Sequence, residues 1–303
     1  MHPHKKARVD DRALLLDDGK LQGRAIQERM HAVRRARMND SLAAEAAESF
    51  VQAWLTGKRL KQLPSVLTTE QLFRVHLAIQ RHPRIIYELG GLGGYKMGGI
   101  GAVPDEPWLY APLFSKFIVP APGASLPGAA IGRSAIEAEV AVIMGEDVCV
   151  RADGQPHTVD AVWSAVAQVV LAFEVCGKRG MPEAIAGAST LSKMADTMSS
   201  GGLILGPRLP AATVDAEVLR TCNIDMFVNE TKVAEGAGLA IPAGSVPEAV
   251  AYLANHLNSR RLSLKKGDAI TTGARHVYKN VKPGDRVRAQ FSGFGTVEMI
   301  VSH

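Results

Sequence analysis

Two glutamates on one predicted strand are the residues best suited to chemistry in this sequence. Glu137 and Glu139 lie in the run from Ile136 to Met144, whose other side chains are all apolar. Alternate side chains of a strand share a face, so both carboxylates point the same way. They repel each other and are costly to desolvate, and a divalent cation relieves both problems. Oxygen ligands favour Mg²⁺ or Mn²⁺ over Zn²⁺. From the pair alone, a solvated sheet face is favoured over a metal site, because two such glutamates are common on sheets with one face in water.

A third carboxylate changes this balance. Glu174 is the only charged residue in the apolar run from Val169 to Cys176. A lone carboxylate in such a strand is rarely buried without a partner. A position at the strand end, reaching solvent, is one explanation. A third ligand for the metal of Glu137 and Glu139 explains its isolation better.

Two glycine-containing segments offer backbone N–H groups and polar side chains. The run Ser199-Ser200-Gly201-Gly202 can present hydroxyl and N–H groups to an anion, but taken alone it is better explained as a plain turn before a strand. The segment Gly90–Gly99 has six glycines around Lys96. Its spacing fits neither a Walker A loop nor the dinucleotide-binding pattern, so nucleotide binding is disfavoured.

Composition limits the classes of function. The net charge of +5 lies mostly in residues 1–40, where ten Lys/Arg face six Asp/Glu and no aromatic residue accompanies the basic cluster. A solvated helix face is therefore favoured over nucleic-acid binding. Apolar runs are too short for a membrane span, and no leader is evident. The three cysteines form no CxxC pair and favour a reducing compartment, so we expect a cytoplasmic protein.

Periodicity and turn residues predict an α+β protein in two regions. Residues 1–88 are expected to form a helical N-terminal region, with helices over 21–38, 42–56 and 69–80, the last capped by Thr68 and Gln71. Residues 89–303 are expected to form the catalytic domain, whose short strands belong to rolled or stacked sheets. Helices are expected near 159–166 and 246–259. The expected strands cover 117–119, 136–144, 169–175, 202–205, 224–228, 286–291 and 296–301.

Several motifs together resemble a known family. No single motif is specific, but their order and spacing are. In chain order they are Tyr95-Lys96-Met97-Gly98, Glu137-Ala138-Glu139, Phe173-Glu174 with Arg179, Ala195-Asp196 with Ser199-Ser200-Gly201-Gly202, Gly267-Asp268 with Thr272-Gly273, Lys282-Pro283-Gly284-Asp285, and Phe291 to Val297. They resemble the 2-keto-4-pentenoate hydratase and 4-oxalocrotonate decarboxylase branch of the fumarylacetoacetate hydrolase superfamily. The likeness runs from about residue 68 to the C-terminus.

This resemblance implies a mixed β-roll core with flanking helices and a homo-oligomeric enzyme. It implies Mg²⁺ or Mn²⁺ bound by Glu137, Glu139 and Glu174, and a 2-oxo acid that chelates this metal. It also implies the roles of the surrounding residues. Catalytic roles fall on Lys96 and Ser200, and substrate contacts on Arg179, Ser199, Gly201 and Thr272.

The sequence departs from the branch around the metal site. The aspartate usual near Trp108 is missing, Gly177 replaces another aspartate, and Thr197 replaces an asparagine. His276 stands where a threonine is usual, and we expect it to act as a general acid/base or carboxylate partner, with a surface histidine as the alternative.

The reaction expected from the resemblance is hydration of a 2-hydroxydienoic acid through a stabilised enolate. A 4-oxalocrotonate-type decarboxylase or a fumarylpyruvate-type carbon–carbon hydrolase is the alternative on the same metal site. A degenerate homologue that binds a 2-oxo acid without turnover is the further alternative. The small-molecule acid is the only ligand expected, with neither nucleic acid nor membrane as a partner.

Overall fold

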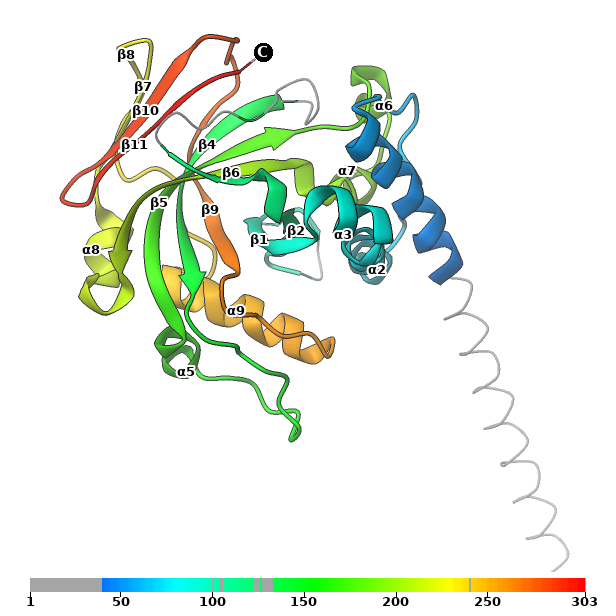
Figure 1. Cartoon of the computed structure of the whole chain (residues 1–303), viewed down its shortest axis with the longest axis horizontal. Helices are drawn as coiled ribbons and strands as arrows, with labels where there is room; N and C mark the ends of the chain where they lie inside the picture. Colours follow the sequence, from blue (N-terminus) through cyan, green and yellow to red (C-terminus); the bar gives the residue numbers. More distant parts are fainter. Residues whose placement is uncertain are drawn as a thin grey trace, which may run out of the picture.

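The computed structural model describes residues 40–99, 101–103, 106–121, 126, 133–239 and 241–302. The helix expected over 21–38 lies outside these residues. The described chain has long curved strands at its centre, helices from its N-terminal part on one side and a small sheet on the other (Figure 1). The α+β class is confirmed.

The central sheet has seven strands in the order β2-β1-β9-β4-β5-β6-β3. Its β1/β9 and β3/β6 pairs are parallel and its other pairs antiparallel, so the sheet is mixed. The strands are β1 (Leu92–Gly98), β2 (Leu109–Phe114), β3 (Ile118–Pro120), β4 (Arg133–Met144), β5 (Val166–Gly177), β6 (Ser200–Pro210) and β9 (Ala269–Tyr278).

A second, antiparallel sheet has the order β11-β10-β7-β8. Its strands are β7 (Ile224–Val228), β8 (Thr231–Ala234), β10 (Arg286–Phe291) and β11 (Gly295–Ile300). This sheet packs on the central one at Gly206 of β6, where an added Cβ would lie 2.8 Å from Val297 of β11. Glycine at this position therefore lets the two sheets approach closely.

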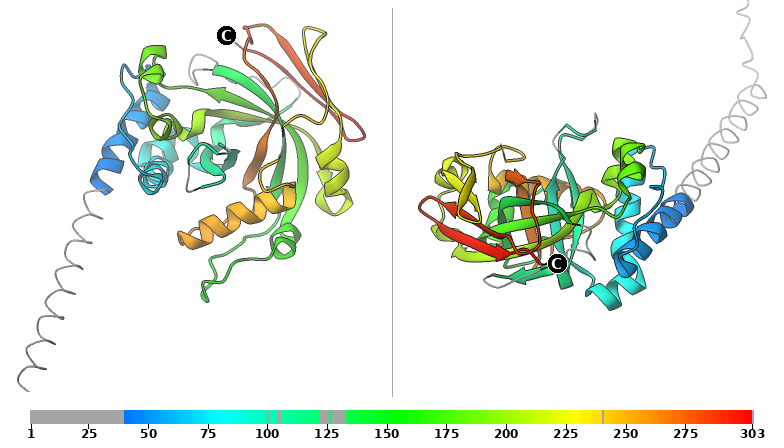
Figure 2. Two further views of the ribbon diagram at one scale, coloured as in Figure 1. Left: turned by 180° about the vertical axis from the view of Figure 1, so that it is seen from behind. Right: turned by 90° about the horizontal axis from the view of Figure 1, so that it is seen from above.

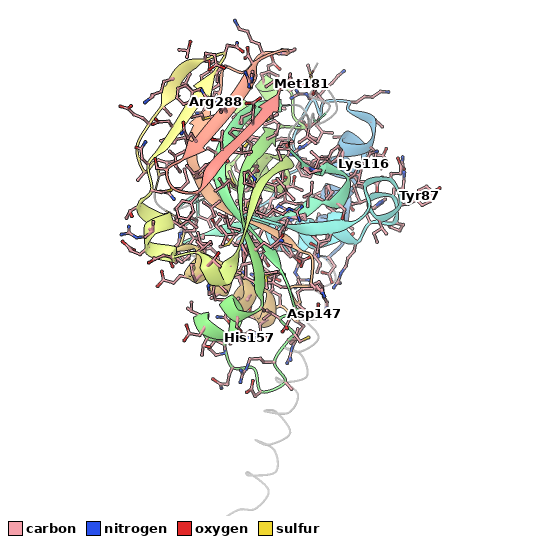
Figure 3. All side chains as sticks on the ribbon, turned by 60° about the vertical axis from the view of Figure 1, so that its left-hand side comes forward. Tyr87, Lys116, Asp147, His157, Met181 and Arg288 are labelled. Carbon is pink, nitrogen blue, oxygen red and sulfur yellow. The ribbon has the colours of Figure 1, made fainter. Side chains whose placement is uncertain are left out.

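Helices cover the central sheet at its β1–β2 end and along one side (Figure 2). Residues 40–56 are helical, and the other α-helices are α2 (Thr69–Arg81), α3 (Pro83–Leu89), α5 (Val159–Ser164), α6 (Pro182–Ala186), α7 (Thr190–Met194), α8 (Ala216–Thr221) and α9 (Val246–Ser259). Short 3₁₀ turns are η1 (Ser115–Phe117), η2 (Thr197–Ser199) and η3 (Ala211–Thr213). Asp147 and His157 mark the β4–α5 loop, which projects away from both sheets (Figure 3). None of the helices in the described ranges is long and apolar enough to cross a membrane.

Capping residues account for the start of α2, the helix expected over 69–80. The Thr68 side chain accepts the Gln71 backbone N–H, as the capping pattern predicts. The Gln71 side chain then accepts the Leu67 N–H at 3.0 Å, one residue before the Thr68 N–H that a full capping box would use. The cap fixes where α2 begins, and its buried face packs into the same hydrophobic core as the sheets.

The two faces of the central sheet differ in their contents. Ile136, Ala138 and Val140 of β4 point into the main core, which continues under the helices. The opposite face carries Glu137 and Glu139, and farther along it holds a small separate cluster of buried apolar residues. That cluster consists of Leu113, Ala141, Val170, Ala172, Leu203, Leu205 and Ala269. This cluster fills one end of the face that carries Glu137 and Glu139, and the two glutamates lie beside it.

A buried histidine in α2 predicts a pH dependence of stability. His76 is 2% exposed, and its Nε2–H donates to the Met194 carbonyl at 3.0 Å, since a carbonyl can only accept. Burial lowers the pKa of His76 from 6.5 to about 4. The unfolded chain therefore binds the extra proton as pH falls from 6.5 to 4, and about 3 kcal/mol of stability is lost in that window.

The His76→Gln variant tests this dependence, because glutamine retains an N–H donor without titrating. Urea unfolding at pH 7 and pH 4.5 should show a smaller loss of unfolding free energy in the variant than in the wild type. Equal losses in both proteins would contradict the assignment of this pH dependence to His76.

Candidate metal and substrate site

Strands β4 and β5 bring three glutamates onto one face of the central sheet. Glu137 pairs directly with Glu174 across the two antiparallel strands, and Glu139 lies two residues farther along β4. Glu174 is 0% exposed and Glu139 1%, whereas Glu137 is half-buried. The shared face expected for Glu137 and Glu139 is confirmed, and the register adds Glu174 to it.

The curvature of the sheet adds a lysine to this group. Lys96 lies in β1, three strand positions from β5 in the sheet order. In a flat sheet this separation would be about 14 Å, at roughly 4.8 Å per strand. The Lys96 ammonium nevertheless forms a buried ion pair with Glu174, which requires the sheet to curl. Burial opposes the charge of Lys96, but Glu174 together with the neighbouring Cys176, Glu137 and Glu139 outweighs this effect, and the pKa of Lys96 is raised.

Two oxygens of the acidic group have no hydrogen-bond partner. Glu139 Oε2 accepts the Gly273 N–H at 3.1 Å, but Glu139 Oε1 and Glu174 Oε2 are buried and unpartnered. Three carboxylates against one ammonium leave a formal charge of −2, which one divalent cation balances. Burial and neighbouring carboxylates raise the pKa of Glu139. The donor set therefore fits a divalent cation that prefers oxygen ligands.

A cysteine that sequence reasoning missed also belongs to this group. Cys176 lies two residues after Glu174 in β5 and is 6% exposed. Its Sγ, one carboxylate oxygen of Glu137 and one of Glu174 all lie within 4.8 Å of one another. The i, i+2 spacing from Glu174 was the signal that could have identified it.

A cavity of about 480 Å³ opens beside the acidic residues. Its polar lining includes Lys96, Glu137 and Ser199, together with Lys178 and Lys279, two lysines that the motif comparison did not single out. The apolar lining comes from Met97, Met194, Met198, Leu239, Pro242 and Val277. A larger cavity, of about 740 Å³, lies beside α2 and is lined by none of the expected site residues.

The glycines around Lys96 are required for different structural reasons. An added Cβ at Gly94 would lie 1.8 Å from the Ala269 carbonyl oxygen of β9, and one at Gly93 would collide with Ser115. Gly98 and Gly99 instead line the cavity. The segment is thus a strand in close contact with its neighbours, and only its end meets the cavity.

The turn before β6 holds an unusual backbone conformation. Thr197, Met198 and Ser199 have φ angles of 43°, 50° and 60°, a left-handed region that L-residues occupy at a cost. Met198 and Ser199 line the cavity, whereas Ser200 is buried at the start of β6 and is followed by Gly201. Such strain persists only where the surroundings enforce it, and it concentrates at functional sites.

Arg179 holds this turn in place. It is 2% exposed, and its Nε donates to Asp196 Oδ1 at 2.5 Å. Its Nη2 donates to the Asp196 carbonyl at 3.0 Å and to Thr197 Oγ1 at 3.3 Å, and its Nη1 donates to the Ser200 carbonyl. The guanidinium also lies 4.2 Å from the centre of the Trp54 ring. These contacts place Arg179 behind the cavity wall and not among its lining residues.

Removal of Arg179 should destabilise the fold strongly. In Arg179→Met the buried Asp196 carboxylate loses its charged partner, which typically costs about 3–5 kcal/mol. Urea unfolding measures this loss. Arg220→Met is the matched control, because Arg220 forms an exposed ion pair with Glu217 and its loss should change the free energy of unfolding very little. Equal effects of the two changes would contradict the structural role of Arg179.

Two other expected site residues, His276 and Thr272, make hydrogen bonds away from the acidic group. His276 pairs with Ala138, on the face opposite Glu137, and its Nε2 lies 3.1 Å from the Ile224 carbonyl and 3.2 Å from that of Gly236. Thr272 is buried and donates its hydroxyl to the Val140 carbonyl at 2.8 Å. The structure therefore brings Lys96, Glu137, Glu139 and Glu174 together, and it does not bring His276 to them.

Comparisons with known proteins identify the family of this chain. A family model described as "Fumarylacetoacetate (FAA) hydrolase C-terminal" matches residues 95–302. The chain belongs to this family. The match begins one residue before Lys96 and includes every member of the acidic group.

Named relatives of this hydrolase family have different activities. A 2-keto-4-pentenoate hydratase of Paraburkholderia xenovorans (strain LB400) is 30% identical over 175 residues, which are 57% of this chain and 61% of the relative. A 4-oxalocrotonate decarboxylase of Pseudomonas putida is 32% identical over 162 residues, 54% of this chain and 58% of that protein. The matched part thus spans about three fifths of the length of these relatives.

A solved structure shares most of the fold. The 4-oxalocrotonate decarboxylase from Pseudomonas putida G7, complexed with magnesium and adipate, has a TM-score of 0.71 and 25% sequence identity. The alignment covers 86% of this chain and 97% of that one. The expected fumarylacetoacetate hydrolase type of fold is confirmed.

Proposed function

We propose that this protein is a divalent-metal-dependent lyase of the 2-keto-4-pentenoate hydratase type, which adds water to a 2-hydroxydienoic acid. One observation carries the proposal. Three carboxylates and one buried lysine lie together beside a cavity, and their net formal charge is −2. Two of the carboxylate oxygens have no hydrogen-bond partner. The similarity to a named hydratase supports the same reaction class.

Glu137, Glu139 and Glu174 would hold a divalent cation, Mg²⁺ or Mn²⁺. When bound, the cation supplies Lewis-acid stabilisation of negative charge on the 2-oxo oxygen of the substrate. The similar decarboxylase structure is complexed with magnesium and adipate, which supports binding of a divalent metal and of a small carboxylic acid by this fold.

Lys96 provides a fixed positive charge in the cavity. Because Glu174 and the other acidic neighbours raise its pKa against the effect of burial, it is an ammonium at neutral pH and acts as a hydrogen-bond donor and not as a nucleophile. It would stabilise the substrate carboxylate and the developing enolate. In the hydration, a proton moves from the 2-hydroxyl to the terminal carbon, and water then adds across the remaining carbon–carbon double bond. The strained turn that carries Ser199 would fix the position of its hydroxyl beside the substrate.

The cavity also has a feature that favours a second candidate, a decarboxylase acting on a 2-oxo diacid. Lys178 follows β5 and Lys279 follows β9, so both stand at the same end of strands that flank β4. Both line the cavity, and in the described part of the chain neither ammonium has a carboxylate partner. A second carboxylate on the substrate would supply one.

Product analysis with two substrates tests both candidates. With Mg²⁺ or Mn²⁺, 2-hydroxypenta-2,4-dienoate should lose its dienol absorbance and yield a 4-hydroxy-2-oxo acid. Release of CO₂ from 2-oxohex-3-enedioate, without hydration of the dienoate, would support the decarboxylase instead. Failure of turnover across a panel of 2-oxo acids, with metal still bound, would contradict both and indicate a degenerate homologue.

A further inference from the structure

Cys176 is the one member of the acidic group that the proposed function leaves without a task. Glu174 and Cys176 lie on the same face of β5 because they are two residues apart. Cys176 also lines the cavity and is nearly buried. Its thiol thus lies beside the Glu137 and Glu174 carboxylates and in the wall of the cavity.

Strand irregularities surround this cysteine. The β5–β6 register shifts between Val175 and Cys176, and the β4–β5 register shifts between Arg133 and Ala135, the residue paired with Cys176. Bulges change the direction of a side chain and are frequent next to active sites. The extra residue lies in β4 in one case and in β6 in the other, so β5 keeps the alternation that places Glu174 and Cys176 on one face, and both of its neighbours are irregular beside the thiol.

The spacing of the donor atoms suits a single ion. Sγ of Cys176 and one oxygen each of Glu137 and Glu174 lie within 4.8 Å of one another. Donor atoms of a tetrahedral ion with bonds of about 2.0–2.3 Å are roughly 3.3–3.8 Å apart, so a small contraction suffices. Glu174 Oε2 and Glu139 Oε1, both buried, still lack partners and offer further donors.

We propose that Cys176 is a sulfur ligand of the metal centre, so that the centre prefers Co²⁺ or Zn²⁺ to Mg²⁺. The proposal rests on the metal site of the proposed function and specifies which ions it takes. Hard cations such as Mg²⁺ gain little from sulfur, whereas borderline ions bind it well. Coordination forms a metal–sulfur bond, and the thiol proton leaves to solvent.

Cobalt titration of the full-length protein tests the proposal directly, because a cobalt–thiolate bond has a near-ultraviolet charge-transfer band. The wild type should show this band at one equivalent of Co²⁺. Cys176→Ser should lose the band while keeping the visible cobalt bands from the carboxylate ligands. Its Co²⁺ affinity should fall by at least about tenfold and its Mg²⁺ affinity should change little.

Two other cysteines provide matched controls. Cys222 is buried and Cys149 exposed, and neither lines the cavity. Cys222→Ser and Cys149→Ser should retain the charge-transfer band. Cys176→Ala, compared with the wild type by circular dichroism and thermal unfolding, separates loss of a ligand from loss of the fold.

The outcomes distinguish this proposal from the proposed function. Co²⁺ binding without a sulfur band in the wild type, or an unchanged band in Cys176→Ser, would overturn the role of Cys176 and leave the carboxylate site standing. Absence of any divalent-metal binding in the wild type would overturn both.

Discussion

Replacement of Glu174 by glutamine is expected to abolish metal binding and turnover. Glu174 faces Glu137 across the strand pair, holds the Lys96 ammonium and keeps one unpartnered oxygen. Glutamine preserves the shape of the side chain and removes its charge. Loss of an outer-shell partner typically costs about 10–100-fold in metal affinity, so loss of a direct ligand should exceed that range.

Calorimetric titration with Mn²⁺ measures this effect. Glu217→Gln is the control, because Glu217 is exposed on α8 and forms an ion pair with the nearby Arg220, so its loss should leave Mn²⁺ affinity unchanged. A Glu174→Gln protein that folds and binds Mn²⁺ as tightly as the wild type would remove Glu174 from the ligand set.

Replacement of Lys96 by methionine should have opposite effects on turnover and on metal affinity. Turnover should fall by about 10²–10⁴, since a charge and proton donor beside the substrate is lost. Metal affinity should rise, because the ammonium that repels the cation and occupies Glu174 is gone. Without metal the variant should unfold more easily than the wild type, because Glu174 is left as an unpaired buried carboxylate.

Parallel kinetics and Mn²⁺ titration of Lys96→Met measure both quantities. Lys116→Met is the control, since Lys116 is exposed at the surface (Figure 3) and should alter neither turnover nor metal affinity. A loss of turnover together with an equal loss of metal affinity would indicate general damage to the site and contradict the role given to Lys96.

Much of the fold was predictable from local patterns. The helices over 42–56, 69–80 and 246–259 were anticipated from periodicity and caps, and strands β4, β5, β7, β10 and β11 from β-rich runs. Strand β1 was missed, since its glycines have low β-propensity. Its pairing with β2 and β9, and the close approach of Gly94 to Ala269, depend on distant parts of the chain.

The candidate site also has a part that local sequence patterns predict and a part that they do not. The shared face of Glu137 and Glu139 follows from the two-residue period of a strand, but the pairing of Glu137 with Glu174 depends on a register that the sequence does not reveal. The position of His276 depends on the bulged β4–β9 register, which sets it opposite Ala138 and away from the carboxylates. Lys178 and Lys279 come together only because β5 and β9, which they follow, both pair with β4 in the folded sheet.

Oxalate binding with and without metal tests the central claim most directly, because oxalate mimics the chelating end of a 2-oxo acid. Calorimetry should show one oxalate bound per chain with Mn²⁺ present, and no binding after chelation of the metal. Glu174→Gln should behave as the metal-free protein does. Oxalate binding of equal strength in the presence and absence of metal would contradict the account.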